Sequence, residues 1–183
     1  MVLLESLNLT LGTTMTSFSL DDPFGVSHDT STLMGEKGLV IIFTCNHCPY
    51  AIAIWDRLIK AAHTYAKLGI NIVAINPNIN PDYPDDSPEA MTLKIQSDQI
   101  PFPYLVDDTQ DIARQYSAQC TPDLYLLDTE MSLIYHGRFD DNWQFPDQVS
   151  THDLTHAVRS LSSQTSIDEH QVPSMGCSIK WVS

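Results

Sequence analysis

A short apolar strand that runs directly into a Cys-x-x-Cys motif constrains the fold more than any other feature of this sequence. Residues 39–43 form an unbroken apolar run rich in β-branched side chains, which is typical of a strand buried on both faces of a parallel or mixed sheet. Cys45 and Cys48 follow it, and apolar residues then recur every three or four positions over residues 51–66, which predicts an amphipathic helix. With a second apolar run at residues 70–75, the segment is a strand–helix–strand unit.

The rest of the chain predicts an α/β protein with a mixed central sheet flanked by helices. Ser87 and Pro88 are typical of a helix cap and a first helical turn, so we expect a helix there that ends near Ser97. Further expected elements are a β-hairpin over residues 18–28, a solvated acidic loop at 82–86, a short helix at 109–116, a hairpin over 124–136 and a last helix from Thr151. We expect residues 1–161 to form one domain and residues 162–183 to form a tail that packs on it.

The charge of the chain narrows the range of partners. Its 183 residues carry 23 acidic and 9 basic side chains, a formal net charge of −14. This charge disfavours nucleic-acid phosphates and anionic lipid surfaces, so we expect neither nucleic acid nor membrane as a partner. No apolar run reaches the length of about 18 residues that a membrane span needs. The first residues lack the basic start of a secretory signal, and we therefore expect a cytoplasmic protein.

Paired cysteines at the start of a helix are suited to redox chemistry. The chain has 4 cysteines, too few for a disulfide scaffold, and in a reducing compartment such pairs are more often catalytic or metal-binding. The two-residue spacing brings both sulfur atoms within bonding range, and the helix N-terminus stabilises a thiolate, the form that attacks disulfides. We expect Cys45 to attack, with a pKa below the usual value of about 8.5, and Cys48 to resolve the intermediate. His47 lies within the motif and would stabilise the Cys45 thiolate. No cofactor is expected.

Two other interpretations of the motif remain open at this point. The pair could form half of a zinc site completed by His47, Cys120 or Cys177, although structural zinc sites usually show two spaced ligand pairs and only one is present here. The cysteines could also be inert core residues. Because the pair follows a buried strand and precedes an amphipathic helix, we favour the redox interpretation and expect no metal.

Other side chains are candidates for auxiliary roles. Cys120 could exchange with the motif or fill the core as a small apolar residue. Cys177, near the C-terminus, could be an extra resolving thiol or a spectator on a docked tail. Arg138 could stabilise a thiolate or an anionic oxygen, or form a surface ion pair with its acidic neighbours Asp140 and Asp141.

The order of the motifs along the chain is itself evidence about the fold. A strand, Cys45-x-x-Cys48, a helix, Thr121-Pro122, a hairpin and a terminal helix together resemble the thioredoxin superfamily. More narrowly, residues 43–49, 120–123, 137–141 and 173–181 are similar to those of bacterial proteins of the alkyl hydroperoxide reductase/thiol-specific antioxidant-like group. The N-terminal hairpin and residues 76–103 are similar to elaborations of the peroxiredoxin-like branch. The resemblance implies a thioredoxin fold with an N-terminal β-hairpin extension and an insertion, and thiol redox or antioxidant chemistry.

The same resemblance implies a role for Thr121 and Pro122. In the thioredoxin fold this position is a cis-proline loop that faces the Cys-x-x-Cys sulfurs and shapes a groove in which an extended substrate segment pairs as an added strand. The residues alone leave open an ordinary trans proline that starts a strand. The chain departs from the peroxiredoxin pattern Pro-x-x-x-Thr-x-x-Cys, because Val40 and His47 stand at the Pro and Cys positions counted from Thr44.

Two classes of function are consistent with these features. The first is a thiol–disulfide oxidoreductase that acts on protein thiols and disulfides, with reduction of small peroxides as its nearest variant. The second is a redox-responsive binding protein, in which the disulfide state of Cys45 and Cys48 would control a partner surface with little turnover.

Overall fold

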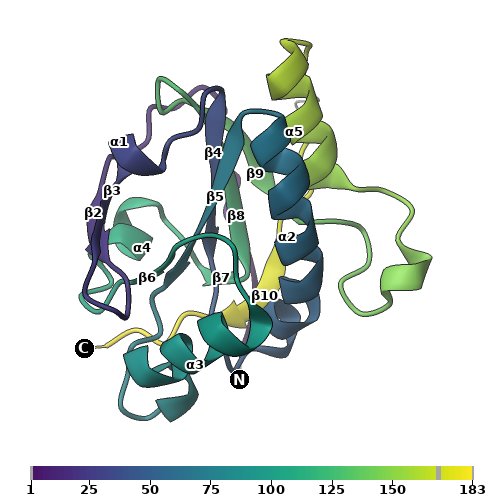
Figure 1. Cartoon of the computed structure of the whole chain (residues 1–183). Helices are drawn as coiled ribbons and strands as arrows, with labels where there is room; N and C mark the ends of the chain where they lie inside the picture. Colours follow the sequence, from purple (N-terminus) through teal and green to yellow (C-terminus); the bar gives the residue numbers. More distant parts are fainter. Residues whose placement is uncertain (1, 168–169, 183) are drawn as a thin grey trace.

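The computed structural model describes residues 2–167 and 170–182. The apolar run after Lys37 forms strand β4 (Gly38–Phe43), the middle strand of a five-stranded mixed sheet. The strand order is β6-β5-β4-β8-β9 (Figure 1). The other strands are β5 (Ile70–Asn76), β6 (Tyr104–Val106), β8 (Asp123–Asp128) and β9 (Leu133–Gly137). Strands β4, β5 and β6 are parallel to one another, whereas β8 and β9 each run antiparallel to the preceding strand of the sheet.

Helices cover both faces of this sheet, as Figure 1 shows. On one face lie α2 and α5, with α3 packed against the same core, and on the other face lie α1 and α4. Their bounds are α1 (Thr30–Leu33), α2 (Pro49–Lys67), α3 (Pro88–Asp98), α4 (Asp111–Gln115) and α5 (Asp153–Ser163). Single turns of 3₁₀-helix lie at Pro84–Asp86 and Pro146–Gln148.

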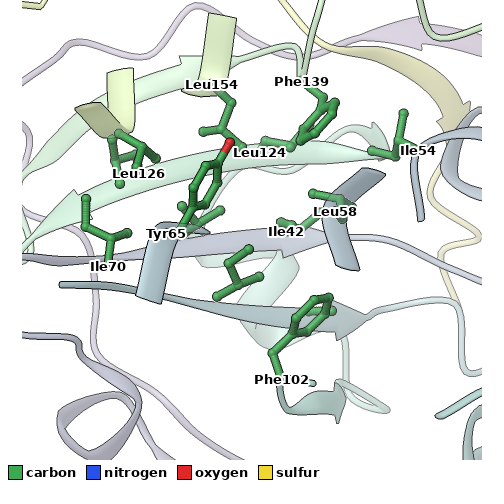
Figure 2. Close-up of a cluster of buried hydrophobic side chains, with 14 of the residues drawn as sticks. Ile42, Ile54, Leu58, Tyr65, Ile70, Phe102, Leu124, Leu126, Phe139 and Leu154 are labelled. Atoms are coloured by element: carbon green, nitrogen blue, oxygen red, sulfur yellow. The ribbon is translucent and has the colours of Figure 1, made fainter. Parts of the chain in front are cut away.

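Alternate side chains of β4 point to opposite faces, which explains why its sequence is apolar at every position. Ile42 packs with Leu58 of α2 and Leu154 of α5 in one core (Figure 2). Ile41 and Phe43 pack in the second core, on the side of α1 and α4. Both faces of the strand are therefore buried, as the unbroken apolar run predicts.

Short strands from both ends of the chain join a strand beside the proline loop in a second sheet, next to the Cys-x-x-Cys motif. Strands β1 (Leu3–Glu5), β10 (Met175–Ser178) and β7 (Cys120–Thr121) pair antiparallel in the order β1-β10-β7. The cis peptide bond Thr121–Pro122 joins β7 to β8. The C-terminal strand thus lies between the N-terminal strand and the proline loop.

The expected fold class is confirmed, with a mixed central sheet flanked by helices. The predicted N-terminal hairpin is formed by β2 (Ser19–Asp21) and β3 (Ser27–Asp29). Ser87 caps α3 as predicted, since its Oγ accepts a hydrogen bond of 3.2 Å from the Ala90 N–H. The Thr121–Pro122 bond is cis, as the resemblance to the thioredoxin superfamily implies.

Some elements have no counterpart in the sequence-based prediction, namely β1, α1, β6 and β10. Each contains only three or four residues, so it is too short to display a period of its own. Strand β10 belongs to the predicted tail and pairs with strands from the first 161 residues. The division of the chain at residue 161 stays a prediction. No helix within residues 2–167 and 170–182 combines the length and the apolar character that a membrane crossing requires.

The packing of α2 on the sheet leads to a test of the core. Leu58 is buried, with 1% of its surface exposed, whereas Leu93 on α3 is 67% exposed. We expect Leu58→Ala to lower the free energy of unfolding by about 2–5 kcal/mol, because it removes buried contacts and leaves a cavity. Leu93→Ala is the matched control, and its effect should stay within about 0.5 kcal/mol. Urea unfolding followed by circular dichroism measures both, and equal effects would contradict this assignment of the core.

Candidate functional site

The Cys-x-x-Cys motif occupies the turn between the end of β4 and the start of α2. Cys48 is the N-cap residue of α2, and Pro49 follows as the first helical residue, where a missing N–H costs little. The N-terminus of a helix carries N–H groups without intrahelical partners and a positive partial charge, so Cys48 lies where a thiolate is stabilised. Both cysteine side chains are fully buried, with 0% of their surface exposed.

Polar groups surround the two sulfur atoms. Cys48 Sγ lies 3.0 Å from the carbonyl oxygen of Thr121 and 2.6 Å from Cys177 Sγ. Hydrogen bonds from the Cys45 thiol and the Ala51 N–H also reach Cys48, and Cys45 Sγ is 3.2 Å from Thr121 Oγ1. The S–H and N–H donors favour a thiolate at Cys48, whereas the Thr121 carbonyl favours its protonated form. Cys45 and Cys48 are not joined by a disulfide, so this is the dithiol form of the motif.

These contacts make the two thiols of the motif unequal. Hydrogen bonds from the Cys45 and Cys177 thiols lower the pKa of Cys48 to about 5. Burial raises the pKa of Cys45 well above its usual value, and the hydrogen bond to Cys48 and the nearby Asp86 carboxylate raise it further. These directions differ from the expectation that Cys45 has the lower pKa. The physical difference is that Cys48 occupies the helix N-cap, whereas Cys45 is buried beside the Asp86 carboxylate.

His47 is held by a carboxylate that the sequence places in a solvated loop. Nδ1 of His47 shares a hydrogen bond with Asp86 Oδ2, and the His47 ring centroid lies 4.9 Å from that of Tyr83. The other carboxylate oxygen, Oδ1, accepts a hydrogen bond of 2.6 Å from the Asn46 N–H. Asp86 is fully buried, so the prediction of a solvated loop is wrong at this residue. The turn Pro84–Asp86 folds its side chain under the motif, a contact for which the local sequence carries no signal.

Asp86 also changes the set of residues that could bind a metal. Within the part of the chain that the structure describes, ligand atoms of Cys45, His47 and Asp86 lie within 4.8 Å of one another, close enough to hold an ion. In the alternative zinc interpretation Asp86 would therefore replace Cys120 and Cys177. The carboxylate engages Nδ1 of His47, while Nε2 is buried and makes no hydrogen bond to the described residues.

Thr121 and Pro122 lie against the sulfur atoms, but the strand edge beside them is occupied. Cys177 of β10 pairs with Thr121 in the antiparallel register. Gly176 comes so close that a Cβ atom added there would lie 2.0 Å from the Thr121 carbonyl oxygen. The resemblance implies that a substrate segment pairs at this edge, and such pairing would require β10 to leave it.

The remaining predicted candidates are Cys120 and Arg138. Cys120 is buried, its Sγ is 3.6 Å from the Pro122 carbonyl oxygen, and burial raises the pKa of its thiol. Cys120 therefore has the surroundings of a small, buried apolar residue. Arg138 forms an ion pair with Asp153, with Nε 3.0 Å from Oδ2, and not with the acidic neighbours suggested by its local sequence.

A cleft of about 210 Å³ opens beside Pro122. Tyr50 and Trp143 line it, with ring centroids 4.2 Å apart, together with Met175 of β10. The charged residues of the wall are Arg138, Glu5, Asp140 and Asp141. The cleft thus adjoins the proline loop and the first turn of α2, and it is large enough to receive a side chain.

The chain is similar to known proteins in both sequence and structure. The AhpC/TSA family model matches residues 11–136. No curated protein matches the sequence. A conserved protein from Geobacillus kaustophilus is 36% identical with a TM-score of 0.94, and the match covers 100% of this chain and 97% of that one. A hypothetical protein from Sinorhizobium meliloti 1021 is also 36% identical, with a TM-score of 0.92 and 98% of each chain covered.

The fold extends to proteins of much lower identity. Peroxidoxin BcpB from Mycobacterium tuberculosis is 15% identical with a TM-score of 0.63, and the match covers 87% of this chain and all of that one. The family model itself spans more than half of the sequence and includes Cys45, Cys48 and Thr121. On these grounds the chain belongs to the AhpC/TSA family.

Proposed function

We propose that this protein is a thiol–disulfide oxidoreductase in which Cys45 and Cys48 alternate between a dithiol and a disulfide. One observation carries the proposal: the two thiols pack in one buried cluster at the N-terminus of α2, and both sulfur atoms contact Thr121 of the cis-proline loop. Membership of the AhpC/TSA family supports thiol redox chemistry in general. A cytoplasmic setting belongs to the same proposal, because a reducing compartment would keep the pair available as thiols.

The chemistry requires one ionised sulfur and one protonated sulfur in contact. A thiolate attacks a substrate disulfide and forms a mixed disulfide, and the second thiol then attacks the mixed disulfide and releases the reduced substrate. The lowered pKa of Cys48 supplies a thiolate at neutral pH, and the raised pKa of Cys45 keeps a proton ready for the leaving group. Asp86 orients the His47 imidazole through the hydrogen bond at Nδ1, and its negative charge raises the pKa of Cys45.

The cleft beside Pro122 supports a protein or peptide substrate. Its aromatic wall, formed by Tyr50 and Trp143, would receive an apolar side chain next to the scissile disulfide. A second candidate, reduction of a small hydroperoxide, is favoured by the complete burial of both sulfur atoms, which a small oxidant tolerates best. Against it, the position of the peroxide-reactive cysteine in the peroxiredoxin pattern is taken by His47.

Steady-state turnover separates these functions. We expect the protein to reduce the disulfides of insulin at the expense of dithiothreitol faster than the uncatalysed reaction, and faster than it reduces hydrogen peroxide. Cys45→Ser and Cys48→Ser should each return the rate to the background, because the cycle needs both sulfur atoms. Cys120→Ala is the matched control and should keep the wild-type rate. A wild-type protein without turnover on either substrate would contradict the proposal and favour the binding-protein alternative.

The unequal thiols can be tested by titration. We expect the ultraviolet absorbance of the reduced protein to show one thiolate that forms as the pH rises through about 5 and is protonated below that value. Cys48→Ser should remove this transition, whereas Cys120→Ala should leave it unchanged. If Cys45→Ser instead removes the transition while Cys48→Ser retains it, the ionised sulfur is Cys45 and the assignment to the helix N-cap is wrong.

A further inference from the structure

The C-terminal strand carries a cysteine into the centre of the site. β10 lies between β1 and β7, and its register sets Cys177 opposite Thr121. The strand therefore occupies the edge at which a substrate segment would pair in the proposed function. In addition, its cysteine lies against a sulfur of the motif, as the cysteine of a bound substrate would.

The distances single out one pair of sulfurs. Cys177 Sγ lies 2.6 Å from Cys48 Sγ, and a disulfide holds its sulfur atoms about 2.05 Å apart. Cys45, Cys48 and Cys177 pack in one buried cluster with Ala51. The neighbouring thiol of Cys120 is directed at the Pro122 carbonyl oxygen instead. Cys48 is thus the central sulfur, with Cys45 on the same turn and Cys177 on the facing strand.

The local sequence of β10 is adapted to this close approach. A Cβ atom on Gly176 would lie 2.0 Å from the Thr121 carbonyl oxygen, so any larger residue would push the strand away. Ser174 Oγ donates a hydrogen bond of 2.7 Å to the Pro122 carbonyl oxygen and anchors the preceding turn. Lys180 provides a positive charge that acts on Cys177. The close approach at Gly176 and the Ser174 hydrogen bond hold β10 where Cys177 Sγ lies 2.6 Å from Cys48 Sγ.

We propose that Cys177 is a third redox thiol that exchanges with the motif and forms a disulfide with Cys48. This inference rests on the proposed function, which supplies the Cys45–Cys48 disulfide from which exchange starts. Cys177 Sγ attacks Cys48 Sγ, the Cys45–Cys48 bond breaks, and the proton of Cys177 passes to Cys45. One S–S bond forms as one breaks, so the step needs neither oxidant nor reductant.

The exchange changes what the molecule presents to a substrate. In the Cys48–Cys177 form, β10 is covalently linked to the N-terminus of α2, and the strand edge at Thr121 is closed. Cys45 returns to the thiol state, and Cys48 is held in the disulfide with β10. The tail therefore acts as an internal substrate that accepts the disulfide from the motif.

Disulfide mapping of the full-length protein tests this exchange. Reduced protein is oxidised with glutathione disulfide, alkylated, cleaved with trypsin and analysed by mass spectrometry. Cleavage at Lys37, Arg57, Arg159 and Lys180 leaves Cys45 and Cys48 in residues 38–57 and Cys177 in residues 160–180. A Cys45–Cys48 disulfide therefore closes a loop within one peptide, whereas a Cys48–Cys177 disulfide links two peptides.

The variants separate the exchange from the proposed function. We expect both products in the wild-type protein, only the linked peptides in Cys45→Ser, and only the looped peptide in Cys177→Ser. Cys120→Ser, the matched control on the adjacent strand, should give both products. Gly176→Ala keeps every thiol but displaces β10, and should lower the yield of linked peptides about tenfold while the loop still forms.

The outcomes of the mapping have distinct meanings. A looped peptide in the wild-type protein together with no linked peptides in Cys45→Ser would overturn the role of Cys177 and leave the proposed function intact. The absence of the loop in both the wild-type protein and Cys177→Ser, together with absent insulin turnover, would overturn the proposed function itself. Linked peptides in which fragmentation shows Cys177 bonded to Cys45 and not to Cys48 would also contradict the inference.

Discussion

The docking of β10 against Thr121 is the contact on which the arrangement of the site depends. Because Gly176 has no Cβ, the strand approaches the Thr121 backbone closely, and Cys177 reaches Cys48. The same packing leaves Cys45, Cys48 and Cys177 with at most 1% of their surface exposed. Burial alone would make thiols unreactive, but hydrogen-bond partners within the site stabilise the charge on one of them.

Helix α2 and the Asp86 carboxylate have opposite effects on the ionisation of the motif's thiols. The helix N-terminus favours negative charge at Cys48, whereas the carboxylate raises the pKa of Cys45. In the proposed function these two effects supply one ionised and one protonated sulfur, which is the combination that thiol–disulfide exchange uses. Asp86 also fixes the imidazole of His47 and the backbone of Asn46, so the same side chain shapes the turn and tunes its chemistry.

The site extends beyond the segment that defines the family. The AhpC/TSA match covers residues 11–136, which include the Cys-x-x-Cys motif and the proline loop but neither β1 nor β10. The similarity to the Geobacillus kaustophilus protein, in contrast, spans the whole chain. The terminal strands therefore belong to the architecture shared with this narrower group, and they complete a thiol site whose other parts lie within the family segment.

Local patterns in the sequence determined the elements that carry the motif. The apolar run of β4, the three-to-four residue spacing of α2 and the Ser87 cap are each specified by neighbouring residues, and all three are present. The cis bond before Pro122 was implied by resemblance to a family, not by the residues alone. Strands of three or four residues, such as β1 and β10, were not predicted, because their formation depends on partners that are distant in the sequence.

Only the tertiary structure decided which groups meet at the sulfur atoms. Cys48 and Cys177 are 129 positions apart, and His47 and Asp86 are 39 positions apart. No pattern within a window of sequence encodes such contacts, because they arise from the way β10 and the Pro84–Asp86 turn pack on the sheet. The pKa values of the thiols follow the same division: the sequence supplied two cysteines at a helix tip, and burial and the surrounding groups shift their pKa values in opposite directions.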